Sequence, residues 1–270
     1  MGVLSKLYAY LYLRGFRVWA SYRTQAVLTM LSWVLPVFTY YFTGTALGNQ
    51  LVSKLGMGAG NYTSFFVVGL AFQGYVSSTI ATVSQRLRNE QLYGTLEYYV
   101  LSPSGVLGFL VYSSIWGFAL NSVSAAVILA VGAALGVRFL PSGMLAASMM
   151  IALLMISTFG IAAMSGAVVM VTKQGNPISF FFSTFTTLMG GVVFPAAALP
   201  WYLRYVSYGI PLTWALEGLR GALLYGEGLW ELLPFIAVLA VFAAVTVPLG
   251  LLSYRLAFDR ARRDGTLSQY

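Results

Sequence analysis

The chain has 270 residues, of which 59% are hydrophobic and only 8% are charged, and its mean hydropathy is +0.80. Soluble domains carry about 25% charged residues, so this composition excludes a water-soluble globular protein and indicates an all-α polytopic membrane protein. The net charge of +8 fits basic side chains beside lipid headgroups rather than a nucleic-acid partner. With no cysteine or histidine, the chain cannot form disulfides, Cys/His zinc sites or an imidazole acid–base catalyst.

Residues 1–23 are predicted to form an amphipathic helix that lies on the membrane surface. At 100° per residue, seven apolar side chains fall on one face, and basic side chains cluster on the opposite face. This pattern is typical of interfacial helices. A basic anchor without a defined helix is the alternative. The apolar face consists of Leu4, Leu7, Tyr8, Leu11, Val18, Trp19 and Tyr22, and the basic face of Lys6, Arg14 and Arg17.

Six charge-free stretches of the chain are long enough to cross a membrane. A charged side chain at the centre of a helix costs roughly 2.5–3.5 kcal/mol on insertion, and about 20 apolar residues suffice for a span. A proline that follows a capping residue marks the start of two spans, at Ser102-Pro103 and Asn176-Pro177. The sequence therefore predicts one transmembrane domain, 1–270, with six helices near 25–47, 62–84, 105–133, 143–171, 177–195 and 233–254.

The distribution of basic residues predicts which side of the membrane holds the two termini. Six spans put both termini on one side, and 11 of the 15 Lys and Arg residues fall there. By the positive-inside rule, that side is the cytoplasm, and the protein is a multi-pass protein of the plasma (inner) membrane. The loop at 86–101 and the tail at 255–270 are then cytoplasmic, and 196–231 forms an outer loop. The four outer basic residues are Lys54, Arg138, Arg204 and Arg220.

The loop between the second and third predicted spans concentrates charge between two apolar stretches. Leu92, Leu96 and Val100 recur at every fourth residue, which predicts a short amphipathic helix over 90–100. Gly94 costs about 1 kcal/mol in such a helix relative to alanine, and it would permit a bend or a close approach. The charges would face water or a partner protein; a solvated loop that only sets topology is the alternative. The charged residues are Arg86, Arg88, Glu90 and Glu97.

No nucleotide-binding or catalytic motif is evident in the chain. A P-loop needs Gly-Lys followed by Ser or Thr, and none of Lys6, Lys54 and Lys173 stands in that context. We therefore expect a protein that is not an enzyme and holds no metal or cofactor itself. The predicted span centres also lack ionisable residues, which disfavours a carrier driven by an ion gradient. Energy for transport would then come from a separate protein.

The segment that follows the fifth predicted span is too apolar and too often interrupted for an ordinary loop. From Pro177 to Val193, 17 residues would extend roughly 26 Å as a helix, which barely crosses a core of about 30 Å. Pro195 and Pro200 then break the helix, and a further short helix is predicted over 211–225. We expect re-entrant or interfacial helices here, covered by protein because irregular backbone is costly in lipid.

Two further groups of side chains are candidates for specific roles. Glu217 and Arg220 are three residues apart on a predicted helix and can pair, and a structural pair is favoured over a substrate site. Most aromatic side chains are expected to pack in the bundle or to form interfacial belts. Three of them are candidates to line an apolar substrate path, namely Phe72, Phe181 and Phe185.

Two sets of residues resemble the permease subunits of type-2 ABC exporters. The first set, Glu90, Gly94-Thr95-Leu96-Glu97 and Ser102-Pro103, looks like that family's cytoplasmic coupling helix. Tyr98 and Tyr99 depart from the pattern, because aliphatic residues are commoner there. The second set resembles the family's fifth span and last outer loop. It comprises Gly190-Gly191-Val192-Val193-Phe194-Pro195, Leu199-Pro200, Pro211-Leu212-Thr213 and Arg220.

The resemblance implies a transport subunit that works within a larger complex. Two such permeases, identical or different, would meet around a path, and two cytoplasmic ATPase subunits would bind ATP and Mg. The expected cargo is an amphipathic or lipidic molecule or a hydrophobic drug. A lipid-linked polysaccharide is the alternative within the family, and an ion-coupled secondary transporter is the alternative from another class. The expected coupling residues are Arg86, Arg88, Glu90, Gly94, Thr95, Leu96 and Glu97, and the expected outer gate is Phe194, Pro195, Leu199 and Pro200.

Overall fold

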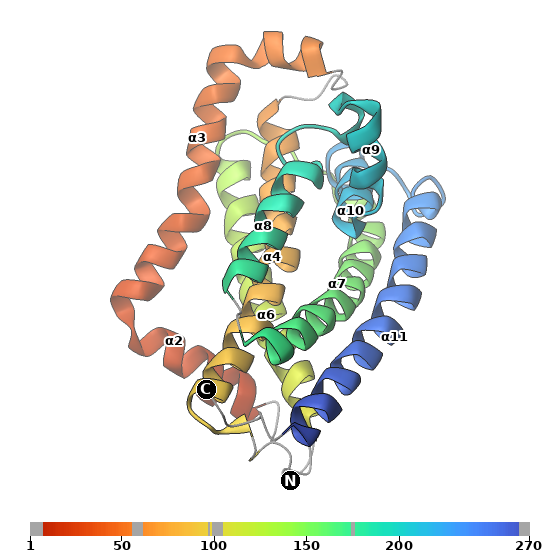
Figure 1. Cartoon of the computed structure of the whole chain (residues 1–270). Helices are drawn as coiled ribbons and strands as arrows, with labels where there is room; N and C mark the ends of the chain where they lie inside the picture. Colours follow the sequence, from red (N-terminus) through yellow and green to blue (C-terminus); the bar gives the residue numbers. More distant parts are fainter. Residues whose placement is uncertain (1–7, 56–61, 97, 99–104, 174–175, 265–270) are drawn as a thin grey trace.

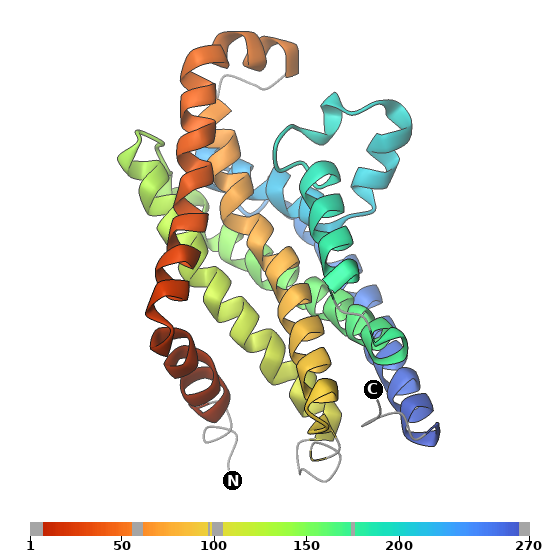
Figure 2. The same cartoon turned by 60° about the vertical axis from the view of Figure 1, so that its left-hand side comes forward.

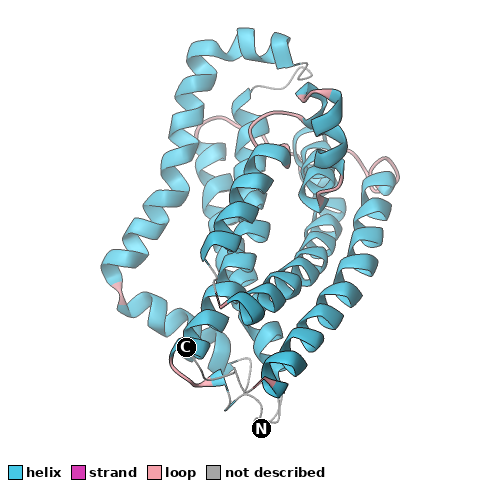
Figure 3. Ribbon diagram, viewed as in Figure 1, coloured by secondary structure: helices cyan, strands magenta, loops and turns pink. Residues whose placement is uncertain are grey.

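The computed structural model describes residues 8–55, 62–96, 98, 105–173 and 176–264, and all the regular structure in these ranges is helical (Figures 1 and 3). The predicted all-α class is therefore confirmed. The elements are η1 (Tyr8–Phe16), α2 (Arg17–Ser21), α3 (Arg23–Leu55), α4 (Tyr62–Leu92), α6 (Gly105–Ala134), η2 (Pro141–Gly143), α7 (Met144–Thr172), α8 (Asn176–Met189), η3 (Ala196–Ala198), α9 (Trp201–Tyr208), α10 (Pro211–Arg220), η4 (Gly221–Tyr225) and α11 (Leu233–Arg263).

Five helices in the described part of the chain are long and apolar enough to cross a membrane. The fifth predicted span, 177–195, instead forms α8, which has 14 residues and extends about 21 Å. That length falls short of a hydrocarbon core of about 30 Å, so α8 is not among the five. The membrane-length segments are Arg23–Ala46, Tyr62–Leu92, Gly105–Ala134, Pro141–Thr172 and Leu233–Arg263.

The long helices alternate in direction along one bundle (Figures 1 and 2). The end that carries η1 and the last turns of α4 and α11 is called the near end below. The opposite end, with η2, η3, α9 and η4, is called the far end. The helix α8 runs from the near end towards the far end, so the described chain starts and finishes at the near end.

The centre of the bundle is α4, which packs against α3, α6, α7, α8 and α10. Of its most apolar stretch, 61% is buried, compared with 6% for α3, which stands at the edge of the bundle (Figure 2). Small residues allow the closest approach. A Cβ on Gly250 of α11 would lie 2.2 Å from the carbonyl oxygen of Gly160 in α7. Such small-residue contacts are typical of helix packing in membranes.

Several helices extend beyond the predicted span limits. The helix α4 continues to Leu92 instead of ending near 84, and α11 continues to Arg263, through most of the predicted polar tail. The helix α3 continues to Leu55 instead of 47. Charge-free windows mark only the part of a helix that lipid surrounds, whereas backbone hydrogen bonding continues through charged turns in the interface.

The N-terminal segment is helical from Tyr8 to Ser21 and is separated from α3 at Tyr22, whose φ and ψ are −93° and 71°. The residues before Tyr8 lie outside the described range. A packing contact with α6 holds the segment, because Gly15 is buried and a Cβ there would lie 2.3 Å from the Trp116 ring. The helix was predicted, but this contact was not. The attachment of the segment to a membrane surface stays a prediction.

Candidate functional site

The near end of α4 finishes in a glycine turn within the predicted coupling segment. Gly94 adopts φ +66°, its N–H donates to the Gln91 carbonyl (3.1 Å), and the Thr95 N–H donates to the Glu90 carbonyl (2.9 Å). This pair of bonds is a Schellman motif, which satisfies the last carbonyls of a helix and favours glycine in the left-handed region. The predicted helix over 90–100 is therefore interrupted at Gly94, where the sequence left a bend open.

A second helical segment begins directly after this turn. Leu96 and Tyr98 are helical, whereas Glu97, Tyr99 and the Ser102-Pro103 pair lie outside the described residues. The Thr95 hydroxyl donates to the Glu90 carboxylate, so Glu90 joins the end of α4 to the start of the next segment. The charge of Glu90 thus has a structural role inside the turn as well as any role towards a partner.

The last turns of α4 are fastened to the end of α7. The Arg88 guanidinium donates to the carbonyl of Lys173, and Gln91 Nε2 donates to the carbonyl of Met170 at 3.4 Å. Lys173 itself has a left-handed φ of 57°, which ends α7. The two helix ends are therefore joined by two side-chain hydrogen bonds.

The turn presents an exposed apolar and aromatic tip at the near end. Leu92 is 48% exposed, Tyr93 77% and Tyr98 72%, whereas Leu96 is fully buried. The predicted apolar face that joined Leu92 to Leu96 therefore does not exist, because Gly94 reverses the chain between them. Tyrosine is among the residues enriched at protein interfaces, so this exposed aromatic tip is a candidate contact surface.

At the far end, Arg220 of α10 binds the backbone of two other segments. Its side chain is buried, with 5% exposed; Nε donates to the Phe65 carbonyl of α4 (3.2 Å), and Nη2 donates to the Gly191 carbonyl (2.9 Å). Burial lowers the pKa of Arg220 to about 9, and the charge of Glu217 opposes that shift. The group stays protonated at neutral pH. Arg220 therefore holds the chain after α8 against α4.

The predicted pairing of Glu217 with Arg220 takes a different form in the structure. Both residues are described, and no ion pair joins them within 4.0 Å. Burial raises the pKa of Glu217, and the charge of Arg220 lowers it again. Arg220 therefore has the predicted structural role, but its partners are backbone carbonyl oxygens instead of Glu217. The helical spacing of three residues allowed a pair but said nothing about acceptors from distant segments.

The segment between α8 and α10 is held by side-chain bonds to its own backbone. Ser207 donates to the Met189 carbonyl (2.5 Å), and Thr213 donates to the Ser207 carbonyl (2.7 Å). Trp214 Nε1 donates to the Tyr208 carbonyl at 2.8 Å, and Arg204 Nη2 donates to the Ala197 carbonyl at 2.5 Å. These bonds satisfy irregular backbone, which membrane depth requires.

The residues predicted for the outer gate lie along this segment with different burial. Leu199 is buried, Phe194 and Pro195 are half-buried, and Pro200 is exposed. Gly191 provides the turn, with φ +76°. Gly69 in α4 was not among the predicted functional residues, yet a Cβ there would lie 2.6 Å from the Val192 carbonyl oxygen. A glycine inside a long apolar helix was the available signal for such a close approach.

The three residues predicted for the substrate path do not share one surface of the chain. Phe72 is 3% exposed and stacks on Tyr75 inside the bundle, with ring centroids 6.2 Å apart. Phe181, on α8, is 63% exposed and stacks on Phe185 at 5.7 Å. The two α8 aromatics therefore remain candidates for a path or an interface, whereas Phe72 is part of the core.

The helical bundle, with five membrane-length helices, defines an integral membrane protein. Residues 10–224 match the ABC-2 type transporter family. The chain belongs to this family, which confirms the resemblance to type-2 ABC permeases. It is similar to the linearmycin resistance permease protein LnrN of Bacillus subtilis (strain 168), with 26% identity over 106 residues. The alignment covers 39% of this chain and 28% of LnrN, less than two thirds of that relative's length.

Proposed function

We propose that this chain is the permease subunit of an ATP-driven exporter, in which the exposed turn at the near end docks a separate ATPase. Membership of the ABC-2 family supports a transport subunit. In this proposal the near end faces the cytoplasm, where the described basic residues of α4 and α11 would satisfy the positive-inside rule. The helix α8 and the segment after it supply the sixth pass, which would put both termini on that side.

The proposed mechanism rests on one observation: α4 is a single helix that contacts both the far-end Arg220 and the near-end turn. From Phe65, which accepts from Arg220, to Glu90, which accepts from Thr95, α4 runs unbroken over about 38 Å. A displacement imposed on the near-end turn would move α4 as a rigid body. Its far end would then shift the Arg220 carbonyl contacts, and with them the segment that carries Phe194 and Pro195. This arrangement would couple ATPase closure to an outer gate.

Exposed apolar faces support a second permease copy in the complex. Only 6% of the membrane-length stretch of α3 is buried in the single chain, and Phe180, Phe181 and Leu188 of α8 are exposed. In the proposal, two copies meet on these faces around a path, and two ATPase subunits bind ATP and Mg on the cytoplasmic side. The chain itself then contributes no catalysis.

The proposed cargo is an amphipathic or lipidic molecule or a hydrophobic drug. The aromatic face of α8 and the absence of charged residues from the span centres support an apolar path. LnrN is named for resistance to linearmycin, which fits export of a small molecule. A lipid-linked polysaccharide is the alternative cargo. An ion-coupled carrier has less support, because it would need acidic groups at the membrane centre.

The docking proposal can be tested with exposed tyrosines at opposite ends of the bundle. We expect Tyr93→Ser to reduce co-purification of the ATPase and to abolish permease-dependent stimulation of ATP hydrolysis. The matched control is Tyr205→Ser, since Tyr205 is 74% exposed in α9 at the far end and Tyr93 is 77% exposed. Both variants should unfold at the wild-type temperature. Equal ATPase binding by the two variants would disprove docking at this turn.

A further inference from the structure

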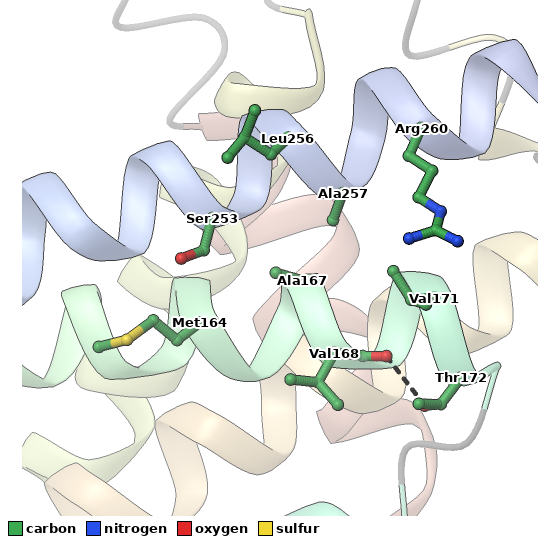
Figure 4. A pocket seen from close by; sticks show the side chains of 9 residues that line it. All are labelled: Met164, Ala167, Val168, Val171, Thr172, Ser253, Leu256, Ala257 and Arg260. Atoms are coloured by element: carbon green, nitrogen blue, oxygen red, sulfur yellow. Dashed lines mark hydrogen bonds between the residues drawn. The ribbon is translucent and has the colours of Figure 1, made fainter.

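An open groove runs between α7 and α11 at the near end, outside both sites described above. It has a volume of about 580 Å³ and is lined by Met164, Ala167, Val168, Val171, Thr172, Ser253, Leu256, Ala257 and Arg260 (Figure 4). Along each helix the lining extends about 10 Å.

Small residues form the groove while α7 and α11 stay in contact. Gly160 and Gly250 bring the two backbones together, and Tyr254 of α11 fills the space beside Gly166, where a Cβ would lie 3.1 Å from its ring. In Figure 4, Ala167 and Ala257 point towards each other between the helices. Because these two side chains end at Cβ, they form the floor of the groove. The larger lining side chains form its walls.

The lining is apolar apart from one charged group at one end. The Thr172 hydroxyl donates to the Val168 carbonyl (2.9 Å, Figure 4) and the Ser253 hydroxyl to the Leu249 carbonyl (2.7 Å), so both hydroxyls are bonded within their own helices. Arg260 has a side chain that is 75% exposed, and it forms an ion pair with Asp264 at 3.7 Å. Exposed pairs of this kind contribute little to stability, so a stronger anion can replace Asp264.

We propose that this groove binds one anionic phospholipid, with an acyl chain along Ala167 and Ala257 and the phosphate on Arg260. An apolar trough that ends in a cation at the membrane boundary is complementary to a lipid with a charged headgroup. A guanidinium binds phosphate in a two-pronged geometry. Arg255, Arg262 and Arg263 are exposed on the same helix but do not line the groove, so Arg260 is the cation that the lining offers to the phosphate. Assignment to the cytoplasmic leaflet rests on the proposed orientation.

The test uses the full-length permease in nanodiscs that contain trace amounts of a photoactivatable lipid with a diazirine in its acyl chain. Labelled phosphatidylglycerol is compared with labelled phosphatidylcholine, and the crosslinked peptides are mapped by mass spectrometry. We expect phosphatidylglycerol to label 164–172 and 253–260 about fivefold more than phosphatidylcholine, as one interfacial arginine attracts an anionic lipid to about that extent.

Two variants with the same net charge distinguish lipid binding in the groove from general attraction between the protein and anionic lipid. Arg260→Gln should reduce phosphatidylglycerol labelling of the groove to the phosphatidylcholine level, whereas Arg263→Gln should leave the preference intact, because Arg263 does not line the groove. Asp264→Asn should strengthen the preference, because it removes the carboxylate that competes for Arg260.

Three outcomes would overturn the proposal: equal labelling by both lipids, equal losses in Arg260→Gln and Arg263→Gln, or labelling that avoids the groove. Labelling elsewhere on α3 provides an internal reference for folding and lipid exposure. The assay contains no ATPase and measures no transport. A failure here is therefore distinct from a failure of the proposed export function.

Discussion

The guanidinium of Arg220 lies over the ring of Phe65, with Cζ 3.3 Å from the ring centroid, while its Nε donates to the carbonyl of the same residue. Residues 155 positions apart in the sequence are thus joined at the far end of α4. The same side chain reaches the carbonyls of Gly191 and Val192, at 2.9 and 3.4 Å. One buried cation therefore organises three segments of the bundle.

Replacing Arg220 with glutamine should destabilise the protein by about 3 kcal/mol, because buried carbonyls lose a charged donor. Arg220→Lys should recover only part of this loss, since a single ammonium cannot reach acceptors on both segments. The measurement is thermal unfolding of purified protein in detergent. Arg138→Gln removes the same charge from an exposed far-end position and should change stability by less than about 0.5 kcal/mol. A similar loss in both variants would contradict the role of Arg220.

Gly94→Ala should loosen the turn at the end of α4 by about 1 kcal/mol, because alanine is disfavoured at φ +66°. Among the described residues, no atom beyond the two neighbouring residues in the chain lies within 4 Å of a Cβ at this position, so the expected effect is conformational. Hydrogen exchange of 89–96 provides the measurement. Gly94→Asn should be milder, since asparagine tolerates the left-handed region. The control is Gly228→Ala, which also has open space around its Cβ and no left-handed φ; an equal effect there would refute the explanation.

Thr95→Val and Glu90→Gln should not act additively. Thr95→Val removes the bond from the Thr95 hydroxyl to the Glu90 carboxylate, and Glu90→Gln replaces its charged acceptor with a weaker neutral amide oxygen, so the double variant should lose less than the sum of the single variants. A coupling of about 1 kcal/mol is expected for contacting residues in such a cycle. The coupling energy is obtained from the free energy of opening of the turn, measured by hydrogen exchange for the wild type, both single variants and the double variant. Strict additivity would show that the bond contributes nothing to the turn.

Gly250→Ala should separate α7 from α11 and destabilise the protein by about 2 kcal/mol, as overpacking does in other cores. The clash is with backbone, because the new Cβ would lie 2.2 Å from the Gly160 carbonyl oxygen and 3.0 Å from its Cα. Side-chain rearrangement cannot relieve it. Thermal unfolding again measures the effect, and Gly228→Ala is the control. Wild-type stability in Gly250→Ala would mean that the helices do not cross at these glycines.

The sequence by itself determined the class of the protein, because the transfer cost of charge depends on composition and not on contacts. Charge-free windows located five long apolar helices, Gly94 permitted a bend in the charged loop, and Pro195 and Pro200 marked the break after the fifth predicted span. The family motifs, read along the chain, were equally local. Such features need no knowledge of which segments meet.

Only the tertiary structure decided where α4 and α11 end, that α8 is short, and which groups Arg220 binds. Helix length beyond the lipid depends on neighbours such as the Lys173 carbonyl, which accepts from Arg88. The acceptors of Arg220 come from residues 28 to 155 positions away, beyond the reach of any helical period. Likewise, Ala167 and Ala257 became the floor of a groove only when two distant helices packed side by side. Pairings of this kind follow from three-dimensional packing, which a one-dimensional pattern does not encode.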